Sequence, residues 1–135
     1  MNLENKMQFV IDELEYQETF LIVTGRTSIG TMKGIWKNIR EPIVGTVYNI
    51  ELRVSNPKEV KVCCENSVPS VYLNNENVVF IGLYEDSDNE VYYLRFAIDW
   101  LDMLDIDAIT PRNKGDYIAF SANWHDIEIY PYDLY

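Results

Sequence analysis

The sequence predicts a mainly β fold, either a single-domain antiparallel sandwich or a strongly bent small barrel, with about nine short strands and at most one short helix. Three observations predict this class. Apolar and polar residues alternate with a period of two in several segments. These segments are rich in β-branched and aromatic residues, and turn-forming residues separate them at intervals of roughly 8–12 residues, which is typical of sandwiches and barrels.

The first half of the chain contains four expected strands. They are residues 7–11, 19–24, 28–36 and 45–54. In the first, Met7, Phe9 and Ile11 fall on one face. Two glycines, Gly30 and Gly34, interrupt the third, and glycine inside a strand pattern indicates a bulge, a tight bend or a close backbone approach. The fourth alternates most clearly and ends at a Ser-Asn-Pro turn signal.

Four further strands are expected after residue 54, and two more segments near the C-terminus could close the fold, so that the expected number is about nine. The four strands are residues 60–64, 71–73, 78–84 and 91–98, and the two closing segments are residues 117–120 and 127–130. Residues 85–89, Glu-Asp-Ser-Asp-Asn, are expected to form a hairpin loop between two of these strands. Pro131 is expected to end the last pairing, because proline has no N–H to donate.

The stretch 99–107, Asp-Trp-Leu-Asp-Met-Leu-Asp-Ile-Asp, is compatible with two conformations. As a helix over 99–106 it would place Trp100 and two apolar neighbours on one face and aspartates on the opposing face. As a strand it would mix acidic and apolar groups on both faces. The pattern favours the helix, because a helix separates the two residue types better.

The length of 135 residues fits one domain, and we expect residues 1–135 to form a single β-rich unit. No apolar run approaches the roughly 18 residues of a membrane span, and residues 1–16 lack the features of a signal peptide, so a cytoplasmic location without membrane binding is expected. The cysteines, Cys63 and Cys64, are adjacent, which disfavours a mutual disulfide and predicts free thiols.

The net charge of −11 is concentrated near the C-terminus. Residues 1–83 hold 10 Asp/Glu and 8 Lys/Arg, a net charge of −2, whereas residues 84–135 hold 12 and 3, a net charge of −9. Such a field repels nucleic acid and anionic lipid and accelerates the approach of a basic protein. The other interpretation is that the charge only aids solubility.

No motif indicates catalysis. Residues 25–32 approximate the phosphate-binding loop GxxxxGK[ST], but the Lys is absent and no helix pattern follows, so a hairpin is the better interpretation. His125 is the only histidine, and zinc sites usually use more nitrogen or sulfur ligands. Pairs of acids such as Asp126 and Glu128 arise by chance in acidic chains. We expect no catalytic residue, no metal and no cofactor.

In overall character, as a compact acidic domain rich in Trp and Tyr, the chain resembles the small immunity proteins of bacterial polymorphic toxin systems. The resemblance implies a cytoplasmic protein that neutralises a basic toxin partner through an acidic, aromatic surface. The residues expected to bind the partner, with aromatics as anchors and acids as steering groups, are Asp99, Trp100, Asp102, Asp105, Asp107, Trp124 and Asp126. The alternative function is a small-ligand-binding barrel or a hydrolase with a carboxylate-lined pocket.

Overall fold

The computed structural model describes residues 7–63, 67–88, 91–105 and 114–132. These residues form eleven strands and one short 3₁₀ helix, η1 (Trp124–Asp126). The predicted mainly β class is confirmed, with more strands than expected. In the described part of the chain, no helix has the length and apolar character needed to cross a membrane.

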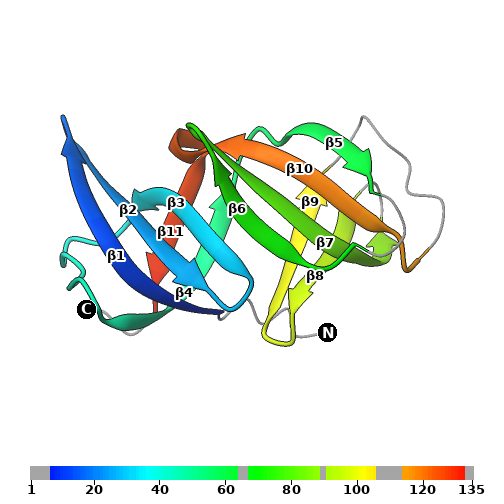
Figure 1. Ribbon diagram of the computed structural model, residues 1–135, viewed down its shortest axis with the longest axis horizontal. Coiled ribbons are helices and arrows are strands. Elements are labelled where there is room, and N and C mark those ends of the chain that lie inside the picture. The colour runs from blue at the N-terminus through cyan, green and yellow to red at the C-terminus, as the bar shows by residue number, and fades with distance from the viewer. Residues whose placement is uncertain (1–6, 64–66, 89–90, 106–113, 133–135) are drawn as a thin grey trace.

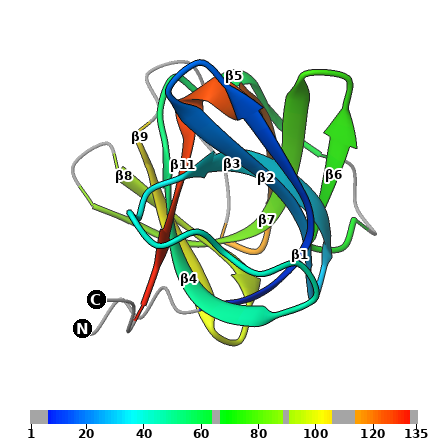
Figure 2. The same ribbon diagram turned by 90° about the vertical axis from the view of Figure 1, so that its left-hand side faces the viewer.

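Five strands close into a barrel, on the left of Figure 1 and seen from its end in Figure 2. They are β1 (Met7–Gln17), β2 (Phe20–Thr27), β3 (Gly30–Trp36), β4 (Val47–Val54) and β11 (Ile127–Pro131). Strands β1 to β3 form an antiparallel meander, β4 pairs with β1 and β11, and β11 closes the ring by pairing in parallel with β3. This is a five-stranded Greek-key barrel.

A β-bulge in β1 changes which residues of that strand point inward. The register with β2 shifts between Ile11 and Glu13, so Asp12 is the extra residue. Before the bulge, Phe9 and Ile11 are fully buried in the barrel. After it, Leu14 packs against the core and the odd-numbered residues point outward. The predicted alternation therefore holds only for the first part of the strand.

The other six strands form a strongly bent sheet on the right of Figure 1. They are β5 (Lys58–Val62), β6 (Ser70–Asn74), β7 (Asn77–Asp88), β8 (Val91–Ala97), β9 (Trp100–Asp105) and β10 (Tyr117–Asn123). The long strand β7 pairs with β10 along one edge, and along the other with β6 and then β8. Strand β7 thereby joins the part of the sheet that contains β6, β10 and β5 to the part that contains β8 and β9.

The barrel and the bent sheet share one core. A single cluster of buried residues includes Phe9 and Ile50 from the barrel and Phe80, Phe96 and Trp100 from the sheet. At the junction, Gly30 of β3 pairs in parallel with Val71 of β6. A side chain at position 30 would overlap the carbonyl oxygen of Val71, which explains why glycine stands there.

The predicted helix over 99–106 is wrong. Residues 100–105 form β9, an antiparallel partner of β8. Pairing with β8 gives backbone partners along one edge of this segment, and the neighbours Trp100 and Leu101 are both buried, at 1% and 6% exposure. Consecutive strand residues point to opposite faces, so a strand that begins with both faces covered does not show a clean alternation. The helical pattern was therefore misleading.

Of two loops that the sequence predicts, the structure confirms one and corrects the other. The hairpin at residues 25–32 is confirmed, since β2 and β3 pair up to Thr27 and Gly30. The hydroxyl of Thr27 accepts a hydrogen bond from the N–H of Ile29 at 3.2 Å and donates one to the carbonyl of Gly30 at 2.9 Å. The loop predicted at 85–89 is wrong for its first four residues, because β7 continues through Asp88 and pairs with β8.

Candidate functional site

The predicted partner-binding residues do not form one surface. Asp99 lies in the β8–β9 turn and Asp102 in β9, whereas Trp124 and Asp126 belong to η1. Figures 1 and 2 place the β8–β9 turn and η1 on opposite sides of the molecule. The side chain of Asp105 and the whole of Asp107 lie outside the described residues.

Trp100 is a core residue. Its ring lies 4.7 Å from that of Phe96 and 6.3 Å from that of Phe80, measured between centroids, and the residue is 1% exposed. An interface anchor must be accessible before the partner arrives, so the structure corrects the role predicted for Trp100. Cys63, by contrast, is a free thiol as predicted.

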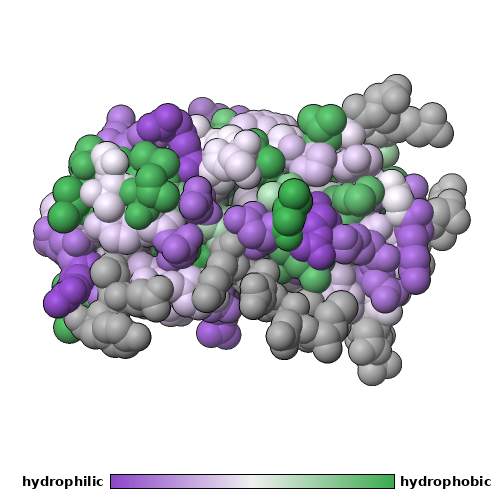
Figure 3. Space-filling view, turned by 90° about the horizontal axis from the view of Figure 1, so that it is seen from below, coloured by the Kyte–Doolittle hydropathy of each residue, from purple (hydrophilic) through white to green (hydrophobic). Residues whose placement is uncertain are grey.

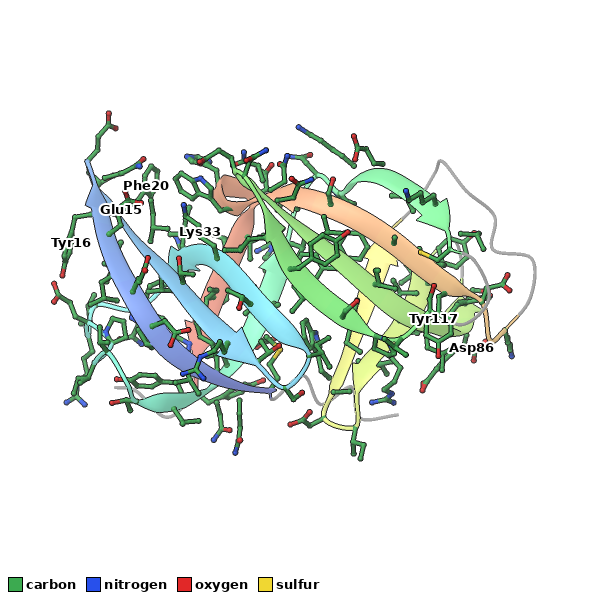
Figure 4. All side chains as sticks on the ribbon, viewed as in Figure 1. Glu15, Tyr16, Phe20, Lys33, Asp86 and Tyr117 are labelled. Atoms are coloured by element: carbon green, nitrogen blue, oxygen red, sulfur yellow. The ribbon has the colours of Figure 1, made fainter. Side chains whose placement is uncertain are left out.

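A different surface brings aromatic and acidic side chains together on the outside of strands β1, β2 and β3. Opposite positions on these strands give two rows of side chains, Glu13, Thr24 and Lys33 in one and Glu15, Ile22 and Ile35 in the next. Gln17 is opposite Phe20 at the end of the β1–β2 hairpin. We call this surface, together with Trp124 and His125 of η1, the β1–β3 face. Figure 4 shows Glu15, Phe20 and Lys33 on the barrel near η1.

A buried apolar cluster lies beneath the centre of the β1–β3 face. Ile22, Ile35 and Trp124 form a small buried cluster against which Phe20 packs. The indole N–H of Trp124 donates to a carboxylate oxygen of Glu76 at 2.6 Å, which fixes the ring on the barrel. This cluster is separate from the main core, and it anchors η1 on the outside of the barrel.

His125 extends the aromatic surface into solvent. It is exposed, and its ring meets that of Phe20 edge to face with centroids 5.0 Å apart. Both residues line a shallow hollow of about 430 Å³ with Gln17, Glu18 and Trp124. A second hollow of about 360 Å³ lies on the same three strands, and its lining includes Glu13, Glu15 and Lys33.

Carboxylates surround this apolar centre. Glu13, Glu15 and Glu18 are exposed at its β1 side, and Glu76 lies beneath Trp124. The cation among the residues that line the two hollows is Lys33, whose ammonium lies 5.5 Å from the centroid of the Trp124 ring. That position directs its charge toward the indole face. The face is therefore negative overall, with an aromatic centre.

Other chemistries find less support in the described residues. No group of three or more His, Cys, Asp or Glu side chains in the described ranges could hold a metal ion. The interior of the barrel is filled by fully buried side chains, including Phe9, Ile11, Met32, Ile50 and Ile129. The hollows on the β1–β3 face are open to the surface and lie outside this packed interior.

Of the residues that form the β1–β3 face, the sequence analysis named Trp124, which the structure places in the buried cluster of that face. The signal for Glu13 and Glu15 was their spacing of two residues, which places two acids on one side of a strand. For Phe20, Lys33 and His125 no local signal existed, because they meet only through strand pairing and the packing of η1.

Comparisons of the chain with protein-family models, curated proteins and solved structures found no match.

Proposed function

We propose that this protein is a binding module that captures a basic protein through its β1–β3 face. The observation that carries the proposal is the arrangement of that face, in which the accessible rings of Phe20 and His125 rest on a buried apolar cluster beside the exposed carboxylates of Glu13, Glu15 and Glu18. Protein interfaces have this anatomy, with aromatic residues at the centre and polar residues around them.

The negative charge of the chain supports a basic protein as the partner. The net charge of −11 and the carboxylates of the face repel nucleic acid and anionic membranes and attract a cationic protein. Arginine suits the hollow beside His125 and Phe20, because its planar guanidinium stacks on aromatic rings while it pairs with a carboxylate such as Glu18. A cationic surface rich in Arg is thus the expected complement.

An inhibitor of the immunity type, which acts in the cytoplasm and blocks a basic toxin, is the specific form of this proposal. It is supported by the acidic charge and by the shallow shape of the face, because a shallow surface suits a protein partner better than a small substrate. The β8–β9 turn, with Asp99, has no part in it, since the turn lies on the other side of the molecule from η1 (Figures 1 and 2).

The test is to map binding of a defined cationic probe. An oligo-arginine peptide titrated into ¹⁵N-labelled protein should shift the amide signals of Glu15, Phe20, Lys33 and His125 more than those of other residues. The double variant Glu13→Gln/Glu15→Gln should weaken binding severalfold at low salt. The matched control Glu51→Gln/Glu59→Gln removes the same charge from exposed positions on β4 and β5 and should weaken it much less.

Two outcomes would contradict the proposal. One is an equal loss of affinity in both double variants, which would mean that the peptide senses only the total charge. The other is a set of shifts centred on Asp86, at the end of the molecule away from the β1–β3 face (Figure 4). If the mapping succeeds, the same variants identify the natural partner, which should be retained from a lysate by the control variant and lost by Glu13→Gln/Glu15→Gln.

A further inference from the structure

A hollow lies away from the β1–β3 face, where the barrel meets the β8–β9 turn. It is an open groove of about 810 Å³. Its apolar walls come from Val10, Ile29, Pro69, Phe96 and Ala97. The β8–β9 turn lies on the underside of the molecule in Figure 1, and Figure 3 shows hydrophobic side chains exposed on that side.

An isoleucine stands at the rim of this groove with its side chain in solvent. Ile98, in the β8–β9 turn, is 99% exposed. The turn is held in place by Arg95, whose guanidinium donates to the carbonyl of Ile98 at 3.1 Å and binds the carboxylate of Glu85 at 2.9 Å. Ile98 is therefore presented by a fixed turn, and its exposure is a feature of the folded state.

The groove also carries one charge of each sign. Arg26 contributes a side chain that is 61% exposed and bonded to Asp12 through Nε at 3.0 Å. Asp99, the neighbour of Ile98, is exposed on the opposite wall. An apolar projection, an apolar groove, a cation and an anion thus lie together on one side of the molecule.

We propose that a second copy of this chain occupies the groove. In a dimer with a twofold axis the same surface meets itself, so a surface that carries both a projection and a matching groove is complementary to its own copy. Ile98 of each protomer enters the apolar groove of its partner, and Asp99 then comes next to Arg26 across the axis. A different protein would have to supply both features and both charges, whereas this chain already has all of them.

The net charge makes this dimer sensitive to salt. Each copy carries −11, so two copies repel each other over distances longer than the interface. Salt screens that repulsion within a Debye length of about 8 Å at physiological ionic strength, while burial of apolar groups does not weaken. Added salt should therefore strengthen self-association, which is the opposite of its effect on capture of a basic partner by the β1–β3 face.

The first test is sedimentation equilibrium of the full chain over a range of concentrations, at low salt and at physiological salt. The variant Ile98→Asp should raise the dimer Kd by about 100-fold or more, because the change enters twice in a twofold interface and sets carboxylates against apolar walls. The control is Ile39→Asp, which changes an isoleucine that is 97% exposed in another loop. The control should dimerise like the wild type.

A charge exchange tests the geometry of the pairing. Asp99→Arg alone and Arg26→Glu alone each set like charges across the axis and should each be monomeric at the concentrations where the wild type dimerises. An equimolar mixture of the two variants restores both opposite-charge contacts and should form a heterodimer. A wild type that stays monomeric in both salts, an Ile98→Asp variant that dimerises normally, or a mixture that does not associate would overturn the proposal.

Discussion

Replacing Gly30 by Ala should separate the barrel from the bent sheet at their junction. Gly30 has φ +141°, a conformation that L side chains rarely adopt, and an added Cβ would overlap the carbonyl oxygen of Val71. That oxygen belongs to the backbone, so a side-chain rotation cannot relieve the overlap. Strand β6 must move away from β3, which also strains the hydrogen bond from the N–H of Val71 to the carbonyl of Ile29, 3.2 Å long.

The expected cost follows from these contacts. A strained backbone of this kind costs about 1–3 kcal/mol, a lost hydrogen bond about 0.5–1.5 kcal/mol, and displacement of the buried Val71 adds to both. Gly30→Ala should therefore lower the free energy of unfolding by at least about 3 kcal/mol, equivalent to a fall in Tm of about 10 °C for a chain of this size.

Gly45→Ala is the matched control. Gly45 also has a positive φ, +87°, but an added Cβ would meet nothing within 4 Å. The variant should lose only the strain, about 1–2 kcal/mol. Urea denaturation followed by tryptophan fluorescence measures both variants, and a second transition in Gly30→Ala would show that the two parts unfold separately. A difference of less than about 0.5 kcal/mol between the variants would refute the reasoning.

Three further predictions concern single interactions. Glu76→Ala removes the acceptor of the Trp124 N–H and should lower stability by about 1–3 kcal/mol, whereas Glu76→Gln keeps an oxygen there and should cost clearly less in the same urea assay. The N–H of Ser87 and the ammonium of Lys114 lower the pKa of Asp86 below its ordinary value of 3.8, so this stabilisation is present above the ordinary value and is lost as pH falls through the lowered one. In a ¹³C NMR titration Lys114→Gln should raise the pKa of Asp86, and an unchanged value would argue against the pair. A hydrogen bond with Glu41 raises the pKa of Tyr16 above 10.0, so this stabilisation is present below the ordinary pKa and is lost as pH rises through the raised one. Glu41→Gln should lower the pKa of Tyr16 in an NMR titration, while Glu51→Gln should leave it unchanged.

Local patterns predicted most strands but not how they pair. The alternation over 45–54 gave β4, and the turn signal at 55–57 gave its end, because both depend on neighbouring residues. Closure of the barrel depends on β1 and β11 both pairing with β4, although more than 100 residues separate β1 from β11 along the chain. No local preference encodes such a contact, so the sequence left sandwich and barrel as alternatives.

The acids that the sequence groups together are not grouped in the structure, because nearness in sequence is not nearness in space. Among the described residues, the acids of this segment are divided between the end of β7, with Glu85 and Asp86, the β8–β9 turn, with Asp99, and later elements such as η1, with Asp126. Glu13 and Glu15 lie in the half of the chain whose net charge is only −2, yet strand pairing brings them beside Phe20 and Ile22. Which acids lie beside aromatic side chains therefore depended on the register of β1, which the sequence pattern did not predict.

The bulge at Asp12 is what allows one strand to serve two surfaces. Before it, Gln8 and Val10 point outward and line the groove near Ile98; after it, Glu13 and Glu15 point outward and border the β1–β3 face. Without the extra residue the outward positions after Ile11 would be the even ones, which would expose Leu14 and bury the two acids. Because the surfaces use different residues, Ile98→Asp should leave peptide capture intact and Glu13→Gln/Glu15→Gln should leave dimerisation intact. If either change abolished both activities, the two surfaces would have to be parts of one.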